Sequence, residues 1–382
     1  MYLSKIEGSP SLELVNLVLE KKGRGEKVVS LAIGDPSMNT PKEIIEVAYQ
    51  SMLSGEVHYI SSYGTMDVRQ AIKDKVARRN SIRAEVENCV FLTTKFSVYA
   101  ALVAVSDSTF DALTPDPGYF YSEPIILSGG NPIYCHLSKD FSLDLDEIRR
   151  KTTPRTKAIL VNTPSNPTSK VFEKSELEEL YNFCSERGIY IISDEAYEDL
   201  VYPTNKKHFS VGSLESSPEI VISLFSLSKS YCMTGWRAGY VVADRKIIHL
   251  INKFLENTVT CFPPFVEKAS AYALNNCDHY IMEFRKEFEK RRNIITEKID
   301  EIDDLTSNEI EGAFYAFPSY RGNIRSTDLA KKILEKKDVA VLPGLAFGSA
   351  GEGHMRLSFS GPLEEIDEGM ERLNDYFREE KR

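Results

Sequence analysis

The chain has 382 residues, 42% of them hydrophobic and 27% charged, which is an ordinary composition for a globular protein long enough for two domains. Its formal net charge of −10 disfavours nucleic acids and anionic membranes as partners, because phosphate-rich surfaces attract basic proteins. This charge does not exclude a small anion bound in a locally positive pocket.

No segment approaches the roughly 18 apolar residues of a membrane helix, and the opening MYLSKIEGSP lacks the apolar core of a signal peptide. The six cysteines are scattered without CxxC spacing, and no pair of the six histidines has metal-ligand spacing. We therefore expect a cytoplasmic protein with reduced thiols and without a metal site.

Short apolar runs alternate with helical patterns between residues 88 and 243. The segment 173–188 has apolar residues at helical spacing and ends in Gly188, a residue typical of helix C-caps. Repetition of strand, helix and strand predicts an α/β fold with a mostly parallel sheet wrapped by helices. The runs expected to form strands are 89–92, 111–115, 158–161, 189–192, 220–225 and 238–243.

After about residue 245 the pattern changes to long helices followed by short strand-like pieces. This change predicts a smaller α+β domain formed by both chain ends, at 1–45 and 271–382, beside a large domain at 46–270. The basic run at 290–292 is interpreted as a solvated helix face. The long helical patterns are 247–257 and 279–302, and the strand-like pieces are 312–318, 339–344 and 354–360.

Polar residues follow three of the predicted strands. Asn166 comes after the run 158–161, Asp194 and Tyr197 come after 189–192, and Lys229 comes after 220–225. Because ligands of parallel sheets bind beyond the carboxyl ends of the strands, we expect these side chains at one edge of the sheet.

The surroundings of Lys229 resemble a phosphate cradle beside an amine. Ser226 and Ser228 offer hydroxyl donors, Arg237 offers a fork of N–H donors, and glycines on both sides of Arg237 allow close backbone approach. A lysine alone is more often a solvated surface charge. In this company it suggests a Schiff base with a phosphorylated aldehyde, and pyridoxal phosphate is the biological one.

Five motifs in order along the chain resemble the signature of class I aminotransferases, which are pyridoxal-phosphate enzymes of fold type I, with most similarity to the aspartate aminotransferase branch. The likeness runs from Gly34 to Arg356 and so spans nearly the whole chain. The motifs are Asn166-Pro167-Thr168, Asp194-Glu195-Ala196-Tyr197, Ser226-Leu227-Ser228-Lys229, Gly235-Trp236-Arg237-Ala238-Gly239 and Arg356-Leu357-Ser358.

The resemblance implies a role for each residue near the cofactor ring. Lys229 would bind the cofactor covalently and then move the substrate's α-proton, and Asp194 would pair with the pyridine nitrogen. Tyr197 and Asn166 would donate hydrogen bonds to the cofactor's 3′ oxygen, and Tyr119 would stack on the ring. The alternative for Asp194 is a helix N-cap.

The resemblance also implies how the phosphate is held. Ser226, Ser228 and Arg237 would bind it, together with Thr94 and backbone amides where the run 89–96 gives way to the helical pattern 97–105. Tyr59 would reach the phosphate of the other subunit, which implies a homodimer with shared active sites. The alternatives for Tyr59 and Tyr119 are a surface tyrosine and a core tyrosine.

Substrate recognition would depend on Arg356, which can hold an α-carboxylate by two parallel hydrogen bonds, with help from Asn166 and the Gly34 amide. An alignment without gaps places Lys95 on a family lysine that lies beside the phosphate and binds the distal carboxylate of acidic substrates. A shift of two residues would place Ser97 there instead, and solvent exposure is the simpler alternative.

The predicted function is a pyridoxal-phosphate-dependent aminotransferase that moves an amino group from an L-amino acid to a 2-oxo acid such as 2-oxoglutarate. Aspartate or another acidic or aromatic amino acid is the candidate donor. The first alternative is a lyase or decarboxylase of the same fold, although Arg356 would hold the carboxylate that a decarboxylase must release. The second is a non-catalytic regulator that senses a ligand.

Overall fold

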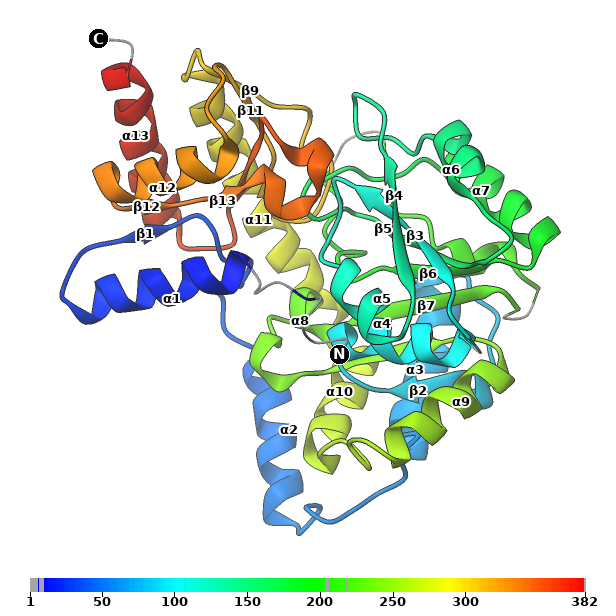
Figure 1. Cartoon of the computed structure of the whole chain (residues 1–382). Coiled ribbons are helices and arrows are strands. Elements are labelled where there is room, and N and C mark those ends of the chain that lie inside the picture. The colour runs from blue at the N-terminus through cyan, green and yellow to red at the C-terminus, as the bar shows by residue number, and fades with distance from the viewer. Residues whose placement is uncertain (1–5, 7–9, 107, 203–205, 217–218, 381–382) are drawn as a thin grey trace.

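The computed structural model describes residues 6, 10–106, 108–202, 206–216 and 219–380. The elements form two units that lie side by side, a large unit around a central sheet and a small unit built from both ends of the chain (Figure 1). The N-terminal helix α1 (Pro10–Gly23) lies beside the C-terminal elements, far from them in sequence.

The large unit contains a seven-stranded sheet. The strands from β4 to β7 run parallel to their neighbours, whereas β8 is antiparallel to both β7 and β2. The central strands are buried over nearly their whole length, because both faces of the sheet are covered. In order across the sheet, the strands are β2 (Cys89–Phe91), β8 (Gly239–Val242), β7 (Val221–Ser226), β6 (Tyr190–Asp194), β5 (Thr156–Asn162), β3 (Asp111–Asp116) and β4 (Asn131–His136).

Helices pack on both faces of this sheet. Side chains alternate along β7, so that Ile222 and Leu224 pack on one layer of helices while Val221 and Phe225 pack on the other. The first layer contains α4 (Thr94–Val105), α5 (Ser122–Leu127) and α9 (Arg245–Glu256). The second contains α2 (Lys42–Leu53), α3 (Met66–Asn80), α10 (Pro264–Asn276), α6 (Leu145–Lys151) and α7 (Lys174–Arg187).

The small unit holds short strands against three helices. Its largest hydrophobic cluster joins these helices to the strand that carries Arg356 and to Tyr197 of the large unit. The helices are α11 (Asp278–Asp300), α12 (Ser326–Lys337) and α13 (Leu363–Glu380). The paired strands are β1 (Val29–Ser30) with β12 (Val339–Ala340), β9 (Leu305–Thr306) with β11 (Ser319–Tyr320), and β14 (Met355–Ser358) between β10 (Tyr315–Ala316) and β13 (Leu342–Pro343).

Short helical turns complete the chain. The turn α8 (Leu227–Ser230) follows β7 directly and is capped by Ser226, whose Oγ accepts a hydrogen bond of 3.2 Å from the Ser228 amide. The 3-10 helices are η2 (Val86–Asn88), η3 (Val211–Leu214), η4 (Thr234–Trp236), η5 (Gly344–Phe347) and η6 (Ser349–Gly351).

The predicted α/β fold is confirmed, and each predicted strand overlaps an observed one. The helix predicted at 173–188 is α7, which Gly188 ends with a φ of 64°. The edge strand β4 was not predicted. The prediction of a solvated face at 290–292 is wrong for Arg291, which is 5% exposed. Its Nη1 donates to the carbonyls of Ser360 and Gly361 at 2.7 and 2.6 Å.

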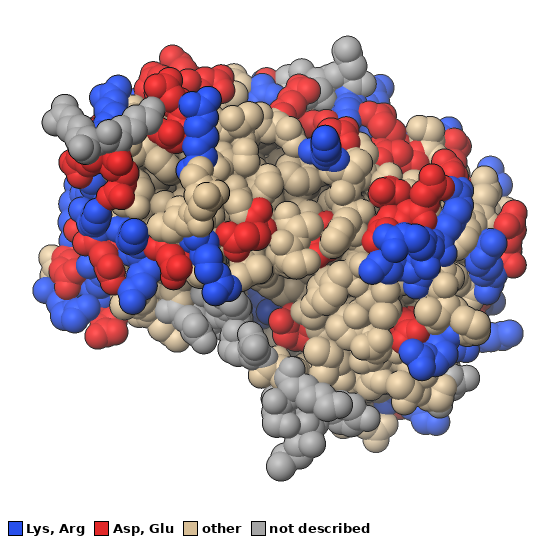
Figure 2. Space-filling view, turned by 45° about the horizontal axis from the view of Figure 1, so that its top comes forward, with Lys and Arg blue, Asp and Glu red and all other residues tan. Residues whose placement is uncertain are grey.

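Charged residues of both signs are interspersed over the outer parts of both units, while the region between the units is mostly uncharged in the view of Figure 2. Within the described residues, no helix is long and apolar enough to span a membrane. All six cysteines are free thiols, five of them buried.

Candidate active site

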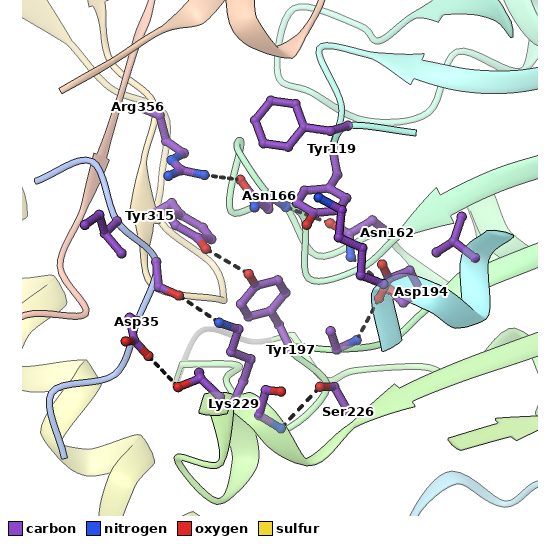
Figure 3. A pocket seen from close by; sticks show the side chains of 18 of the residues that line it. Asp35, Tyr119, Asn162, Asn166, Asp194, Tyr197, Ser226, Lys229, Tyr315 and Arg356 are labelled. Carbon is purple, nitrogen blue, oxygen red and sulfur yellow. Dashed lines mark hydrogen bonds between the residues drawn. The ribbon is translucent and has the colours of Figure 1, made fainter. Parts of the chain in front are cut away.

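A cavity of about 340 Å³ opens at the carboxyl edge of the sheet, where the two units meet (Figure 3). The large unit contributes the ends of three neighbouring strands, as predicted from the sequence. Asn162 ends β5, Asp194 ends β6, and Ser226 ends β7 just before Lys229. The small unit contributes Tyr315 and Arg356, and the segment after β1 contributes residues 32–35.

Asp194 lies at the bottom of the cavity and is 6% exposed. Its Oδ2 accepts a hydrogen bond of 2.9 Å from the Tyr121 hydroxyl, and its Oδ1 accepts one of 3.1 Å from the Ala196 amide. Burial raises the pKa of Asp194 to about 6, and it forms no ion pair with a described residue. The residues after it form a turn, so the alternative of a helix N-cap is wrong. A buried carboxylate without a cation is suited to a protonated nitrogen of a ligand.

Lys229 extends from α8 into the cavity. Its Nζ donates a hydrogen bond of 2.7 Å to the carbonyl oxygen of Gly34 and lies 5.2 Å from the centre of the Phe314 ring. Burial lowers the pKa of Lys229 to about 8, although Asp35 opposes this shift. An amine with a lowered pKa at a cavity wall is available as a nucleophile and as a proton carrier near neutral pH.

Arg356 projects from β14 and is 4% exposed. Its Nη1 donates to Oδ1 of Asn166 at 3.0 Å, and its Nη2 donates to the carbonyl of Ala32. Its Nε is buried without a hydrogen-bond partner among the described residues. Burial lowers the pKa of this guanidinium, which still carries its charge at neutral pH. An orphaned cationic donor inside a cavity is suited to a carboxylate.

A second set of donors faces the cavity near the start of α4. Ser226, Ser228 and Arg237 line the cavity, and Nη2 of Arg237 donates to Oγ1 of Thr93 at 3.1 Å. Helix α4 begins at Thr94, three residues before the expected helical pattern 97–105, and its free amides add positive potential there. The side chain of Thr94 lies outside the described part of the structure.

The remaining predicted residues divide into two groups. Tyr119, Asn166, Tyr197, Gly34 and Lys95 line the cavity. Tyr59 does not line it and is 87% exposed. Ser97, the alternative to Lys95 in the shifted alignment, is fully buried in α4 and does not line the cavity.

The sequence reasoning missed three polar residues of this site. Asn162 and Tyr315 line the cavity, and Tyr121 lies directly behind it. Asn162 accepts from the Asn166 amide through Oδ1 at 2.8 Å and donates to the Asp194 carbonyl at 2.9 Å. The strand-end rule that found Asp194 applies equally to Asn162. Tyr121 supports Asp194 from α5's start, and Tyr315 comes from a strand of the small unit. No local sequence signal marks these two tyrosines.

Comparisons with known proteins agree with this site. Residues 26–373 match the family model described as aminotransferase class I and II. An aspartate aminotransferase of Pyrococcus abyssi is 35% identical, covering 93% of this chain and 92% of its own length. Aromatic-amino-acid aminotransferase 2 of Thermococcus litoralis is 33% identical, covering 93% of each chain.

The crystal structure of an aromatic aminotransferase from Pyrococcus horikoshii OT3 superposes with a TM-score of 0.90 at 34% identity, covering 95% of this chain and 99% of that one. A match over nearly the full length, by sequence and by fold, extends to the lysine-bearing sheet edge described above. The chain therefore belongs to the class I and II aminotransferase family and is a pyridoxal-phosphate-dependent transaminase.

Proposed function

We propose that this transaminase moves the amino group of an acidic or aromatic L-amino acid to a 2-oxo acid such as 2-oxoglutarate, with the residues of the described cavity in the roles below. The observation that carries the proposal is the placement of the Lys229 amine, the Asp194 carboxylate and the Arg356 guanidinium around one cavity. The names of the relatives, aspartate and aromatic aminotransferases, support the two classes of donor.

The cavity residues fit pyridoxal phosphate at three points. Asp194 lacks a cation and would pair with the pyridine nitrogen, while Ser226, Ser228, Arg237 and the start of α4 would hold the phosphate. Lys229 would attach to the aldehyde carbon, and Tyr119 would cover the ring. Tyr197 and Asn166 would donate to the ring's 3′ oxygen. When bound, the cofactor supplies an electron sink for the bond broken at the α-carbon.

The side chains divide the remaining work. Arg356 would bind the α-carboxylate and so fix which α-substituent points toward Lys229, because two parallel hydrogen bonds leave little rotational freedom. The Nζ of Lys229 would take the α-proton and deliver it, because a pKa near 8 lets the amine hold or release a proton close to neutral pH. Tyr315 and Phe347 cover the guanidinium, with ring centres 4.3 and 5.0 Å from Cζ, and exclude water from it.

Lys95 would bind the second carboxylate of acidic substrates. It lines the same cavity as Arg356, its side chain is exposed, and it forms no ion pair or hydrogen bond with a described residue. A free cation at the mouth and a buried cation inside can hold a dicarboxylate at both ends. Ile33, 39% exposed, and Phe120 also line the cavity and offer apolar contacts to an aromatic side chain.

A half-reaction screen tests this function. The loaded enzyme is mixed with single amino acids, and conversion of the aldehyde to the amine form of the cofactor is followed by absorbance. We expect acidic and aromatic donors to convert it. Lys95→Gln should slow acidic donors about tenfold relative to aromatic ones, whereas Lys332→Gln on α12 should change neither. Conversion by no donor, with a response in a lyase assay, would refute transamination.

We also propose a cytoplasmic homodimer in which Tyr59 completes the partner's site. Tyr59 is exposed outside its own cavity, in a part of the sequence where several large apolar side chains are also exposed. These residues lie on α2, in the loop after it and at the start of α3, and are Ile45, Tyr49, Met52, Leu53, Val57 and Met66. The free thiols support the reducing compartment.

Mixing two inactive variants tests the shared site. A hybrid of Tyr59→Ala and Lys229→Ala subunits has one intact site if Tyr59 acts across the interface, so a random mixture should recover about a quarter of the wild-type activity. Recovery of none, in a protein that light scattering shows to be a dimer, would show that Tyr59 does not act across the interface, and full activity of Tyr59→Ala alone would place Tyr59 outside the site.

A further inference from the structure

Tyr315 lies between the two halves of the cavity wall. It is 2% exposed on β10, and its hydroxyl is 2.8 Å from the hydroxyl of Tyr197 (Figure 3). Its ring lies 4.3 Å from the Arg356 guanidinium carbon. Gly34 packs so closely that an added Cβ would lie 2.1 Å from the Tyr315 hydroxyl oxygen, which shows how tightly the ring is held.

The two hydroxyls share one hydrogen bond, in which either oxygen can be the donor. Each phenol has one proton, and neither hydroxyl has another hydrogen-bond partner among the described residues. If Tyr197 donated to Tyr315, its proton would be used in this bond and could not reach a ligand in the cavity, which both tyrosines line. If Tyr315 donates, the proton of Tyr197 is free to point into the cavity.

We propose that Tyr315 is a positioning residue, which donates its hydroxyl proton to Tyr197 and thereby directs the Tyr197 proton to the cofactor's 3′ oxygen, while its ring holds Arg356. The inference rests on the proposed function, in which Tyr197 binds that oxygen. It adds a residue from the small unit to the control of the cofactor. The hydrogen bond also makes Tyr197 a stronger donor, because each bond in a chain polarises the next.

The two roles of Tyr315 are separable by substitution. Tyr315→Phe removes the hydroxyl and keeps the ring over Arg356, whereas Tyr315→Leu removes both. Tyr320→Phe is a matched control, since Tyr320 is 8% exposed on β11, donates to the Ile324 carbonyl at 2.8 Å and does not line the cavity.

The primary measurement is the pH titration of the absorbance of the loaded enzyme without substrate. This titration reports the proton on the nitrogen that joins Lys229 to the cofactor, and donation to the 3′ oxygen lowers its pKa. We expect Tyr315→Phe to raise that pKa by about half a unit to one unit, with KM for the 2-oxo acid unchanged. Tyr315→Leu should in addition raise KM about tenfold through loss of the ring over Arg356. Tyr320→Phe should match the wild type.

A double variant tests the relay even if one substitution perturbs folding. In a Tyr197→Phe background, Tyr315→Phe should cause no further shift, because the relay acts only through the Tyr197 hydroxyl. An unchanged titration in Tyr315→Phe, or an equal shift with and without Tyr197, would overturn the inference. If the wild type shows no titrating band from cofactor joined to Lys229, the proposed function fails, and the relay fails with it.

Discussion

Two lysines of this enzyme lie close to the same strand, β7, and burial lowers the pKa of each to about 8. Lys75 on α3 lies 4.3 Å from the ring centre of Phe225 on β7, and Lys229 follows the end of β7. A lowered pKa alone would mark both as candidate nucleophiles. Their surroundings show why only Lys229 is suited to chemistry.

Lys75 is saturated by partners. It is 1% exposed, donates to Oδ1 of Asn80 at 2.9 Å and forms a buried ion pair with Glu198. Burial disfavours the ionised form of Glu198, but Lys75 and Arg79 hold its pKa below the ordinary value. Among the described residues, Lys229 has one hydrogen-bond partner, the Gly34 carbonyl, and its side chain faces a cavity. The two lysines therefore differ in their access to the cavity and in the number of N–H donors left without a partner. The pKa reports neither property.

The neighbouring acids repeat this contrast. Asp194 faces the cavity without a cation, and burial raises its pKa. The next residue, Glu195, turns away from the cavity and bonds to Ser193 and His208 at 3.0 and 2.8 Å. Glu195, Glu198 and His208 bring potential metal ligands within 4.8 Å of one another. The ammonium of Lys75 pairs with Glu198 and so supplies the positive charge that a metal ion would otherwise bring. We therefore interpret this cluster as structural support behind the site.

The largest expected effect sharpens the comparison at Lys229. Lys229→Ala should lower kcat/KM for transamination by at least about 10⁴-fold, because in the proposed function the amine both binds the cofactor and carries the proton. The urea midpoint of the ligand-free protein should change little, since the substitution removes the hydrogen bond to Gly34 and the burial penalty of the amine together. Borohydride reduction of the loaded wild type, followed by peptide mapping, should label Lys229. A label at Lys75 would break the comparison.

The second prediction concerns stability at Lys75. Lys75→Met leaves Glu198 buried without its main cation, which should lower the free energy of unfolding by about 3–5 kcal/mol. Activity per folded molecule should remain within about threefold of the wild type, because Lys75 does not line the cavity. Urea unfolding and active-site titration measure the two quantities. Lys75→Met with Glu198→Gln should recover part of the loss, because no charge is then left unpaired.

Much of the site could be predicted because the residues that form it directly follow strands that the local sequence pattern identifies, and the sheet topology brings the ends of these strands together. Each apolar run identifies a strand, the alternation with helices sets the strands parallel, and the residues after them meet at one edge. Asn166, Asp194 and Lys229 were found in this way. The motif around Lys229 then restricted the chemistry to a phosphorylated aldehyde.

The missed features depend on segments distant in sequence. Tyr315 lies in the predicted strand-like piece 312–318, but only the fold brings its side chain beside Tyr197 and Arg356. Arg291 is buried by the turn at 360–361 that packs over α11. The edge strand β4 has the sequence NPIYCH and an irregular exposure pattern, so it lacks the alternation of a half-buried strand. From sequence alone, a charged residue is expected to be exposed to solvent, and this expectation fails for Lys75 and Arg291, which are both buried.

The third prediction tests whether the Arg356 guanidinium, whose Nε has no partner among the described residues, binds the substrate. Arg356→Lys keeps the charge but removes the fork of donors and the stacking on Tyr315, so it should raise KM for every α-carboxylate substrate, with kcat/KM falling about 100-fold. Arg291→Lys is a control, because Arg291 is buried but does not line the cavity. It should lower stability without changing KM. An unchanged KM in Arg356→Lys would remove Arg356 from substrate binding.

The smallest effect tests a buried acid that faces no cavity. Glu267 on α10 is 1% exposed, accepts from the Thr65 amide at 2.7 Å through Oε2, and has no partner for Oε1 among the described residues. Burial raises its pKa to about 7. The unfolded chain therefore loses this proton at lower pH than the folded chain does, and the native state loses stability as the pH rises from about 4.5 to about 7.

Glu267→Gln removes the titration and keeps an acceptor for the Thr65 amide. Its gain in unfolding free energy should be about 2 kcal/mol larger at about pH 8.5 than at about pH 5.5. Thr65→Ala leaves the Glu267 carboxyl ionisable and is the comparison variant. Because the Thr65 side chain opposes the rise in the Glu267 pKa, Thr65→Ala should lose at least as much stability with rising pH as the wild type does. Transaminase activity should stay unchanged in Glu267→Gln, because an unsatisfied group remote from the cavity affects folding alone. A loss of activity at constant stability would show that the Glu267 carboxyl, although it lies outside the cavity, contributes to the reaction.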